Sequence, residues 1–394
     1  MSFPQPRTPL RISAIPVLLL VLGLVALTPA RVDAQVQISG QIDLSAVAGG
    51  DDRGVNDAFR RDSPFNPFRA RFFAQHWVSD RVGIFTEVLF DSDSGPRLNG
   101  AYIVANELTG RSWLNARVGL APSLIGSFGL RSTYFNSNPL VGIPLVWQYR
   151  TTLDGSGLVT ADDLLRRKQA NTSFLPMLYD PCWNLQWELL GEVGIFEYSA
   201  GVTSGSMSNP LGAMEADGVQ VLARVGVEPR PGIRIGVSGG VGPYIGGGRR
   251  DPDLSAPDFP GGPEDYDQRL FGYDVEWARG RLQLISEGYH STWEAPLVSE
   301  DLTATGAFLE ARYDFLPRWT GAARTGFIGF NEITPSGAGA TPTGWDDDIA
   351  RFETALTYRW SREVHVRLDW QHNEFLTGSD ASMDLLAFQV RAVF

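Results

Sequence analysis

The sequence predicts an all-β fold, a transmembrane antiparallel β-barrel of about 16 strands. Three observations predict it. Segments of roughly ten residues alternate between apolar and polar side chains, which suits the 9–11 residues of a tilted membrane strand. The connectors between them alternate between short and long. The chain ends in an amphipathic segment whose last residue is Phe394.

Residues 1–34 have the features of a secretion signal. Two arginines precede an apolar stretch at 14–27, which is shorter than the roughly 20 residues that a membrane-spanning helix needs. Small residues follow, with an acceptable cleavage site after Ala34. We expect residues 1–34 to be removed on export, leaving 35–394 as the barrel. The alternative is a membrane anchor that stays attached.

The first alternating segment, 36–46, shows the pattern most cleanly. Successive side chains of a strand point to opposite faces. One face carries Val36, Ile38, Ile42, Leu44 and Ala46, and the other carries Gln37, Ser39, Gln41, Asp43 and Ser45. In a water-soluble sandwich the polar face would meet solvent outside. In a membrane barrel the apolar face meets lipid and the polar face lines the lumen.

Fifteen further segments repeat this alternation along the chain. They span 68–78, 82–90, 98–105, 112–120, 183–190, 195–202, 219–227, 233–241, 268–277, 282–289, 306–315, 320–330, 349–360, 364–371 and 383–394.

The connectors predict how the strands are oriented. Tight connectors rich in Pro, Gly, Ser and Asp occur at 79–81, 192–194, 228–232, 316–318 and 361–363. Others are long and polar, such as 242–267 and 331–348. Short periplasmic turns and long external loops are typical of outer-membrane barrels. With both termini periplasmic the strand count must be even, and the sheet must close because backbone groups in hydrocarbon need partners.

The ends of the strands carry two further signals. An apolar face made of alternate residues from 386 to 394 ends at Phe394, which resembles the signal read by the barrel assembly machinery. Aromatic residues near strand ends suit the interfacial girdles of such barrels. They are Trp77, Trp113, Trp277, Tyr313, Trp319, Trp360 and Trp370.

Charge and cysteine content exclude several classes of partner. Loss of 1–34 removes three arginines and one aspartate, which leaves 30 basic and 44 acidic side chains, a net charge of −14. This balance argues against nucleic acid as a partner. The single cysteine, Cys182, excludes an internal disulfide. No ligand spacing indicates a metal, and we expect no cofactor.

The longest connector, 121–182, is the third external loop of the predicted barrel. It is partly apolar at 124–135 and at 140–147, and 161–170 reads as a short charged helix. We expect it to fold toward the lumen as a constriction loop. The residues expected to form the constriction are Asp162, Asp163, Arg166, Arg167 and Lys168. The alternative is an external cap over the mouth or against a neighbouring subunit.

Charges on the strands should report the inner face, because a base facing lipid at mid-depth costs about 2–4 kcal/mol. The expected wall residues carry both signs. The basic ones are Arg69, Arg71, Arg117, Arg224, Arg234, Arg312, Arg351 and Arg367, and the acidic ones are Glu87, Glu188, Asp274, Glu276, Glu287, Glu310, Glu353 and Asp369. Opposed charges would either create a transverse field or neutralise each other across neighbouring strands.

Short motifs across most of the chain resemble the phosphate-selective porin O/P family. They lie at 69–71, 79–83 with Glu87, 114–119 before Pro122, 187–192, 198–202, 274–280 with Glu287, and in the strand ending at Phe394. The resemblance implies a porin fold. Phosphate-specific members use clustered lysines, whereas this chain has only Lys168. The resemblance therefore does not carry phosphate specificity to this chain.

The expected function is passive diffusion of small hydrophilic or ionic solutes through a water-filled outer-membrane channel. Sixteen strands leave a lumen too wide for side chains to fill. The expected partners are outer-membrane lipid, the barrel assembly machinery and a homotrimer of the kind usual for such porins. The alternatives are a structural or adhesive barrel with a closed pore, and a barrel hydrolase using His290 or His372 rather than His76 or His365.

Overall fold

The computed structural model describes residues 36–50, 55–56, 63–92, 95–127, 138–155, 159–178, 183–208, 218–245, 263–378 and 382–394. The predicted export signal and Cys182 lie outside the described residues.

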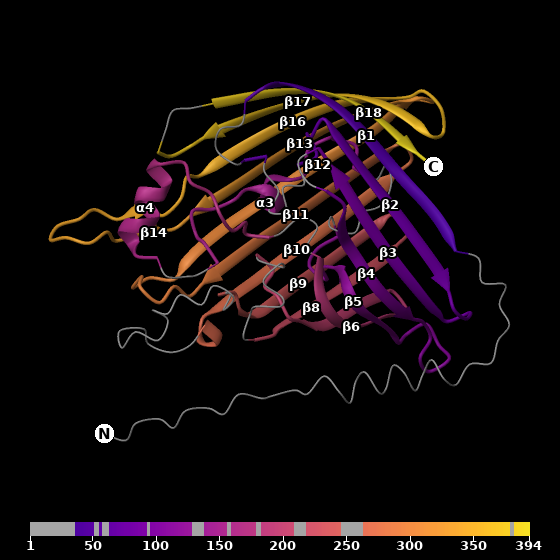
Figure 1. The fold of residues 1–394 in the computed structure, drawn as a ribbon, viewed down its shortest axis with the longest axis horizontal. Helices are drawn as coiled ribbons and strands as arrows, with labels where there is room; N and C mark the ends of the chain where they lie inside the picture. The colour runs from indigo at the N-terminus through magenta and orange to yellow at the C-terminus, as the bar shows by residue number, and fades with distance from the viewer. Residues whose placement is uncertain are drawn as a thin grey trace.

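Sixteen antiparallel strands form one closed barrel (Figure 1). They are β1 (Gln37–Gly49), β2 (Phe68–Trp77), β3 (Val82–Asp91), β4 (Arg97–Ala105), β5 (Asn115–Pro122), β6 (Trp183–Val193), β7 (Phe196–Thr203), β8 (Gln220–Arg230), β9 (Ile233–Pro243), β10 (Asp267–Arg279), β11 (Leu282–Trp293), β12 (Leu302–Leu316), β13 (Trp319–Phe330), β16 (Ile349–Arg359), β17 (Val364–Phe375) and β18 (Ser382–Val393). Each of the sixteen predicted segments overlaps one of these strands, so the predicted fold class is confirmed.

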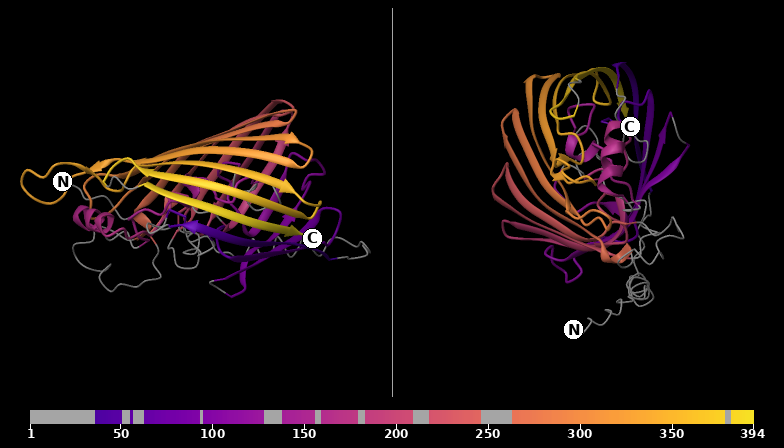
Figure 2. Two further views of the ribbon diagram at one scale, coloured as in Figure 1. Left: turned by 90° about the horizontal axis from the view of Figure 1, so that it is seen from above. Right: turned by 90° about the vertical axis from the view of Figure 1, so that its left-hand side faces the viewer.

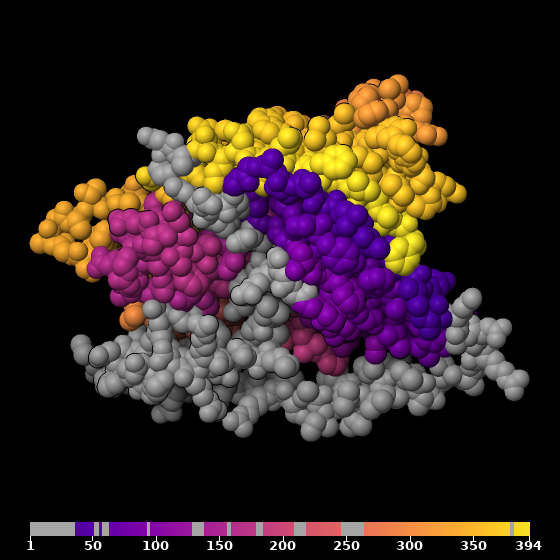
Figure 3. Space-filling model, turned by 45° about the horizontal axis from the view of Figure 1, so that its top comes forward, coloured from indigo at the N-terminus to yellow at the C-terminus, as the bar shows by residue number. Residues whose placement is uncertain are grey.

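The first and last strands close the barrel. Ile42 of β1 lies opposite Ala392 of β18 on one side and opposite Ala70 of β2 on the other. In Figure 3 the indigo β1 lies beside the yellow β18. Every barrel strand therefore has two neighbours, which satisfies the backbone groups that lipid cannot.

The two faces of the sheet differ as the alternation predicts. On β1 the side chain of Ile38 is 68% exposed and that of Asp43 is 2% exposed. On β18 the corresponding values are 47% for Phe388 and 1% for Gln389. The exposed set is apolar and the covered set is polar, which is the reverse of a water-soluble protein and suits a barrel surrounded by lipid.

The connectors divide into a short-turn end and a long-loop end, at the right and left of Figure 1. We call these the periplasmic and external ends, as in barrels of this class. One pair of connectors departs from the predicted alternation. The external connector 92–96 is shorter than the periplasmic connector 106–114, which folds into a turn of its own with Glu107 and Gly110 at positive φ.

Helical structure among the described residues is confined to connectors. The elements are α3 (Leu145–Gln148), α4 (Ala161–Gln169) and the short 3₁₀ helix η3 (Pro263–Asp265), beside a two-stranded hairpin of β14 (Glu332–Ile333) and β15 (Thr343–Gly344). Within the described residues, no helix has the length and apolar character to cross a bilayer. The helix α4 begins with a capping box, in which Thr160 and Asp163 bond each other's backbone N–H groups.

The third external connector folds into the barrel, as predicted. The short helix α3 packs against the inner side of β12 and β13 (Figure 1). Its Trp147 joins an apolar cluster that also contains Trp293 and Trp345 from the barrel end. The apolar core of this protein therefore lies inside the cylinder, between the loop and the wall, while the apolar belt lies outside.

Candidate channel interior

The inserted segment of the third loop is bonded to one wall of the lumen. The backbone N–H of Val141 donates to Asp369 Oδ2 at 2.6 Å. Arg324 donates to the carbonyl oxygen of Gly142 at 2.7 Å, and Arg351 donates to that of Ile143 at 3.2 Å. A Cβ at Gly142 would lie 2.6 Å from a Glu353 oxygen, so the close approach requires glycine.

A second attachment joins the loop to β11. The carboxylate of Glu287 accepts hydrogen bonds from the backbone and hydroxyl of Ser127, both at 2.8 Å, and from Trp147 Nε1 at 3.3 Å. Tyr289 donates to the same carboxylate at 2.6 Å. Gly126 has φ +63°, and a Cβ there would lie 2.0 Å from the Tyr289 hydroxyl oxygen. The loop is therefore held at two places along the wall formed by β11, β12, β13, β16 and β17.

The helix α4, predicted to form the constriction, lies across the external mouth of the barrel (Figures 1 and 2). Asp162 accepts from Ser336 N, and Lys168 pairs with Asp347 at 3.0 Å. Arg166 pairs with Asp163, and Arg167 with Asp154. The prediction placed these charges deeper than they lie: the external loop before β16 contacts Asp162 and Lys168, and Arg166 and Arg167 pair with acids of the third loop itself. The two predicted roles of the loop are divided: residues 138–149 enter the lumen, and α4 covers the mouth.

Two carboxyl groups near α4 have shifted pKa values. Hydrogen bonds from the Thr160 backbone and hydroxyl hold the pKa of Asp163 below its ordinary value. Burial raises the pKa of Asp346 to about 7, although Tyr149 and the backbone N–H groups of Thr152 and Asp347 bond its carboxylate. Asp346 therefore changes charge near neutral pH, at the point where the loop meets the barrel mouth.

The predicted wall residues lie on the inner face, and several meet opposite charges from neighbouring strands. Arg117 pairs with Glu188 at 2.5 Å, and Arg71 lies 3.6 Å from Glu87. Arg69 shares this face of β2 and is buried. These contacts follow from antiparallel pairing, since Arg117 lies directly opposite Glu188 in the register.

Arg351 is an exception to the predicted wall role. Its guanidinium is 2% exposed and bonds Asn373 Oδ1 at 2.7 Å, Val55 O at 2.9 Å and Gln148 Oε1 at 3.1 Å. Loop residues therefore cover it completely. It holds the loop in place and does not face open water.

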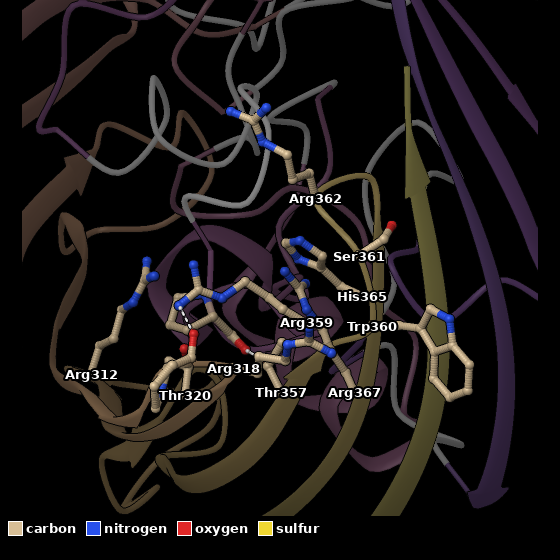
Figure 4. Close-up of a pocket in the computed structure, with 12 residues that line it drawn as sticks. Arg312, Arg318, Thr320, Thr357, Arg359, Trp360, Ser361, Arg362, His365 and Arg367 are labelled. Carbon is tan, nitrogen blue, oxygen red and sulfur yellow. Dashed lines mark hydrogen bonds between the residues drawn. The ribbon is translucent and has the colours of Figure 1, made fainter.

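A cavity of about 670 Å³ opens at the periplasmic end, between β12, β13, β16 and β17 (Figure 4). We call it the arginine cavity. Its charged lining consists of Arg312, Arg318, Arg359, Arg362 and Arg367, together with His365. The sequence analysis named only Arg312 and Arg367 as wall residues. The others occupy strand ends and tight turns, and the clustering of arginine at 359–367 was the signal that could have found them.

A second cavity, of about 350 Å³, lies at the same end beside β5, β6, β7 and β8. We call it the paired cavity. Its arginines are Arg117 and Arg224. Arg224 bonds Glu197 at 2.5 Å and Asp274 at 2.7 Å. Each arginine here therefore has a carboxylate partner on a neighbouring strand.

Two histidines considered for hydrolysis lie near the external end. The ring of His290 contacts Thr305 Oγ1 at 2.7 Å, and that of His372 contacts Asp384 at 3.1 Å. The Asp384 carboxylate also accepts from Trp370 Nε1. The residue facing His290 is thus a threonine rather than the adjacent Ser291.

The terminal residue Phe394 completes the seam between β18 and β1. Its backbone exchanges hydrogen bonds with Gly40 at 2.9 and 3.0 Å. Its ring covers Gly40 and lies 5.9 Å from the ring of Phe72, on the outer side. The ring is 57% exposed, which leaves it accessible from the lipid side.

No model of a known protein family matches this chain, and a search of curated proteins finds no match. Solved structures with a similar fold include a loop L8 deletion mutant of OmpT, an outer membrane protein of Vibrio cholerae (TM-score 0.56, 11% identity, 92% of this chain and 99% of that chain). Another is an anion-selective porin from Comamonas acidovorans (TM-score 0.55, 11% identity, 92% of this chain and 100% of that chain). A third is the outer membrane channel DcaP of Acinetobacter baumannii (TM-score 0.56, 10% identity, 93% of this chain and 99% of that chain).

At these identities the likeness concerns the fold alone. It extends over nearly the whole of this chain and of each similar structure. Together with the apolar outer belt and the inward loop, it identifies the architecture as that of a sixteen-stranded outer-membrane barrel.

Proposed function

We propose that this chain forms a water-filled channel through which small hydrophilic or ionic solutes diffuse passively. The observation that carries the proposal is the polarity of the barrel. The outer face is apolar, the inner face holds charged pairs, and cavities open between the loop and the wall at the periplasmic end. A polar, partly open lumen inside an apolar cylinder is the arrangement that lets water and ions cross a membrane.

The narrow part of the proposed channel is formed by residues 138–149. They are bonded to one continuous part of the wall, from β11 to β17, through Asp369, Arg324 and Glu287. The helix α4 would then act as a filter at the external mouth, where Arg166 is exposed to incoming solutes. Weak ion selectivity would arise from both places, as opposed charges line each of them.

Planar bilayer recordings of the purified protein test this proposal. We expect discrete conductance steps in 1 M KCl, about the ionic strength at which surface charge is screened. Trp147→Ala, which loosens the inserted segment, should raise the single-channel conductance roughly twofold, because the loop limits the open area. Trp113→Ala is the matched control, since Trp113 lies exposed at a periplasmic connector and should leave the conductance unchanged.

Silent bilayers would instead favour a structural or adhesive barrel with a closed pore. The specific observation behind that alternative is the apolar cluster around Trp147, Trp293 and Trp345, which fills part of the external half. Hydrolysis of lipid or peptide that is lost in His290→Ala or His372→Ala would favour the enzyme alternative.

Further expectations rest on the proposed role. Residues 1–34 would be removed on export, Phe394 would be read by the assembly machinery, and the mature chain would form a homotrimer surrounded by lipid. Mass spectrometry of protein from outer membranes tests the cleavage, and native mass spectrometry in detergent tests the trimer. Membership of the phosphate-selective porin O/P family stays a prediction, because no family model matches the chain.

A further inference from the structure

The arginine cavity concentrates positive charge without equivalent negative charge. Figure 4 shows Arg318, Arg359, Arg367 and His365 gathered in one space, with Trp360 directed away from them. Among the described residues that line the cavity there is no acidic side chain. Five guanidinium groups repel one another in a confined space, so the cavity favours any solute that supplies negative charge.

The buried guanidinium of Arg367 has unmet hydrogen-bonding capacity. Its side chain is 2% exposed, and its Nε and Nη1 atoms have no hydrogen-bond partner within the described part of the chain. The Nε of Arg359 is likewise buried without a partner, and its Nη2 donates only to the carbonyl oxygen of Pro317, at 3.3 Å. Buried donors on charged groups are normally satisfied. The unpartnered donors of Arg359 and Arg367 therefore indicate a position where a hydrogen-bond acceptor binds.

The carboxylates nearest the cavity form no direct ion pair with Arg318, Arg359 or Arg367 within the described residues. Asp43 accepts two hydrogen bonds from Arg391, at 2.6 and 3.1 Å. Asp369 accepts from the backbone of Val141 through Oδ2, while its buried Oδ1 has no hydrogen-bond partner within the described residues. At the rim, Asp314 lies 3.8 Å from Arg312, and Glu363 accepts from the hydroxyl of Ser361. None of these four acids neutralises Arg318, Arg359 or Arg367 by a direct ion pair within the described residues.

The same wall also contains a buried arginine, Arg324, that is fully engaged in hydrogen bonds and ion pairs. One layer farther from the periplasmic end, Arg324 bonds Glu353 at 2.7 and 3.0 Å, Glu310 at 3.1 Å and the carbonyl oxygen of Gly142. Arg324 and Arg367 are equally buried. Burial alone therefore does not explain the unpaired donors, since this wall provides carboxylates where a structural pair is formed.

We propose that the arginine cavity is a binding site for a small oxyanion carrying at least two negative charges. Planar guanidinium groups match carboxylate and phosphate oxygens through paired N–H donors. The cavity volume, about 670 Å³, falls within the range of small-molecule sites. His365 adds a further nitrogen to the lining. A carboxylate-rich organic anion and a phosphate-bearing one share this chemistry.

This inference deepens the proposed function, because it names a class of solute that the channel would hold near its periplasmic exit. Binding to the solubilised protein does not require conduction. A protein that binds the anion but gives silent bilayers would overturn the channel and retain the site. A protein that conducts but binds no anion would overturn the site and retain the channel.

Isothermal titration of the full barrel in detergent, with citrate and inorganic phosphate as separate probes and acetate as the monovalent reference, tests the site. We expect one equivalent of citrate or of phosphate to bind, and acetate to bind at least roughly tenfold more weakly, because fewer guanidinium groups can be engaged. The affinity should fall as KCl rises from 0.05 to 0.5 M, about the range over which screening shortens the Debye length severalfold.

Two variants locate the site. Arg318→Gln with Arg359→Gln should weaken the binding at least about tenfold, through loss of charge-assisted hydrogen bonds. Arg281→Gln is the matched control, because Arg281 is an exposed arginine at a periplasmic turn outside the cavity. It should leave binding within about twofold, since an exposed charge outside the lining is screened by water and salt. Circular dichroism of each variant verifies the fold.

Citrate binding without phosphate binding would identify a carboxylate site, and the converse a phosphate site. The proposal is overturned if neither probe binds, or if the double variant binds as tightly as the wild type while the barrel remains folded. Equal loss in Arg281→Gln would also overturn it, because the attraction would then be a general property of the periplasmic surface.

Discussion

The arginine cavity and the paired cavity lie at the same end of one barrel and use arginine in opposite ways. In the paired cavity, Arg117 and Arg224 each meet a carboxylate at 2.5 Å. In the arginine cavity, Arg359 and Arg367 have buried nitrogen atoms with no acceptor within the described residues. The comparison teaches that an inward arginine either joins neighbouring strands or remains available to a solute. The carboxylates within reach on nearby strands decide which: Glu188 lies directly opposite Arg117, and Glu197 lies diagonal to Arg224.

The largest expected effect is the loss of barrel stability when a paired arginine is replaced. Arg224→Met would leave Asp274 buried without a partner, and removing one member of a buried ion pair destabilises by about 3 kcal/mol. We expect a lower denaturation midpoint for urea-induced unfolding of the barrel in lipid vesicles. An unchanged midpoint would show that pairing does not distinguish the two cavities.

The second prediction concerns a substitution that gives the arginine cavity a carboxylate, as the paired cavity already has. Thr357 lies opposite Arg367 in the register and lines the arginine cavity. Thr357→Glu would supply the missing carboxylate, raise stability by about 1 kcal/mol and shift ion selectivity toward cations. Reversal potentials in a KCl gradient measure the shift. Thr357→Gln, of similar size without the charge, is the control and should leave the selectivity near that of the wild type.

A smaller effect is expected for Arg367→Met. Because this guanidinium has no ion-pair partner among the described residues, an apolar replacement of similar length should change the unfolding free energy by less than about 1 kcal/mol in either direction. The same vesicle unfolding assay measures it beside Arg224→Met. A loss as large as that of Arg224→Met would mean that Arg367 is also structurally paired.

The smallest effect concerns the external end, where two neighbouring acids meet one lysine. Asp346 and Asp347 lie against Lys168 of α4 and against Tyr149. Since burial raises the pKa of Asp346 to about 7, its contribution to stability is complete below its ordinary pKa and is lost as the pH rises through 7. Hydrogen-exchange protection factors, which correct for the intrinsic chemical rate, should therefore be lower at 149–152 and in α4 at pH 8 than at pH 5.5.

Asp346→Asn should abolish this pH dependence while keeping the neutral hydrogen-bonding side chain. Exchange in the barrel strands serves as the internal reference, since it should follow only the intrinsic chemical rate. A variant that retains the full difference between the two pH values would assign the dependence to another group.

The alternation of side chains was sufficient to locate all sixteen strands and their faces. It could do so because strand periodicity is local. The polarity of each side chain between 383 and 394 indicates which face of the strand it lies on, whatever residues lie on the neighbouring strands. The same reasoning named Arg117 and Arg367 as wall residues but did not name Arg324 or Arg391, which also pair with acids of neighbouring strands. It failed for α4, whose charges were assigned to the constriction. Helical periodicity predicts the helix but not the distant loop at 336–347 that its charged residues contact.

The sequence by itself therefore determined the barrel, the number of strands and the lipid-facing side chains, and it left two arrangements open for the long third loop. Only the tertiary structure decided what each inward arginine does. Arg324, Arg351 and Arg367 follow the same pattern in the sequence, yet the first joins two acids, the second is covered by the loop and the third faces the arginine cavity. The different roles of these three arginines depend on the register with neighbouring strands and on the position at which residues 138–149 enter the lumen. Both are set by contacts between residues that lie far apart in the chain.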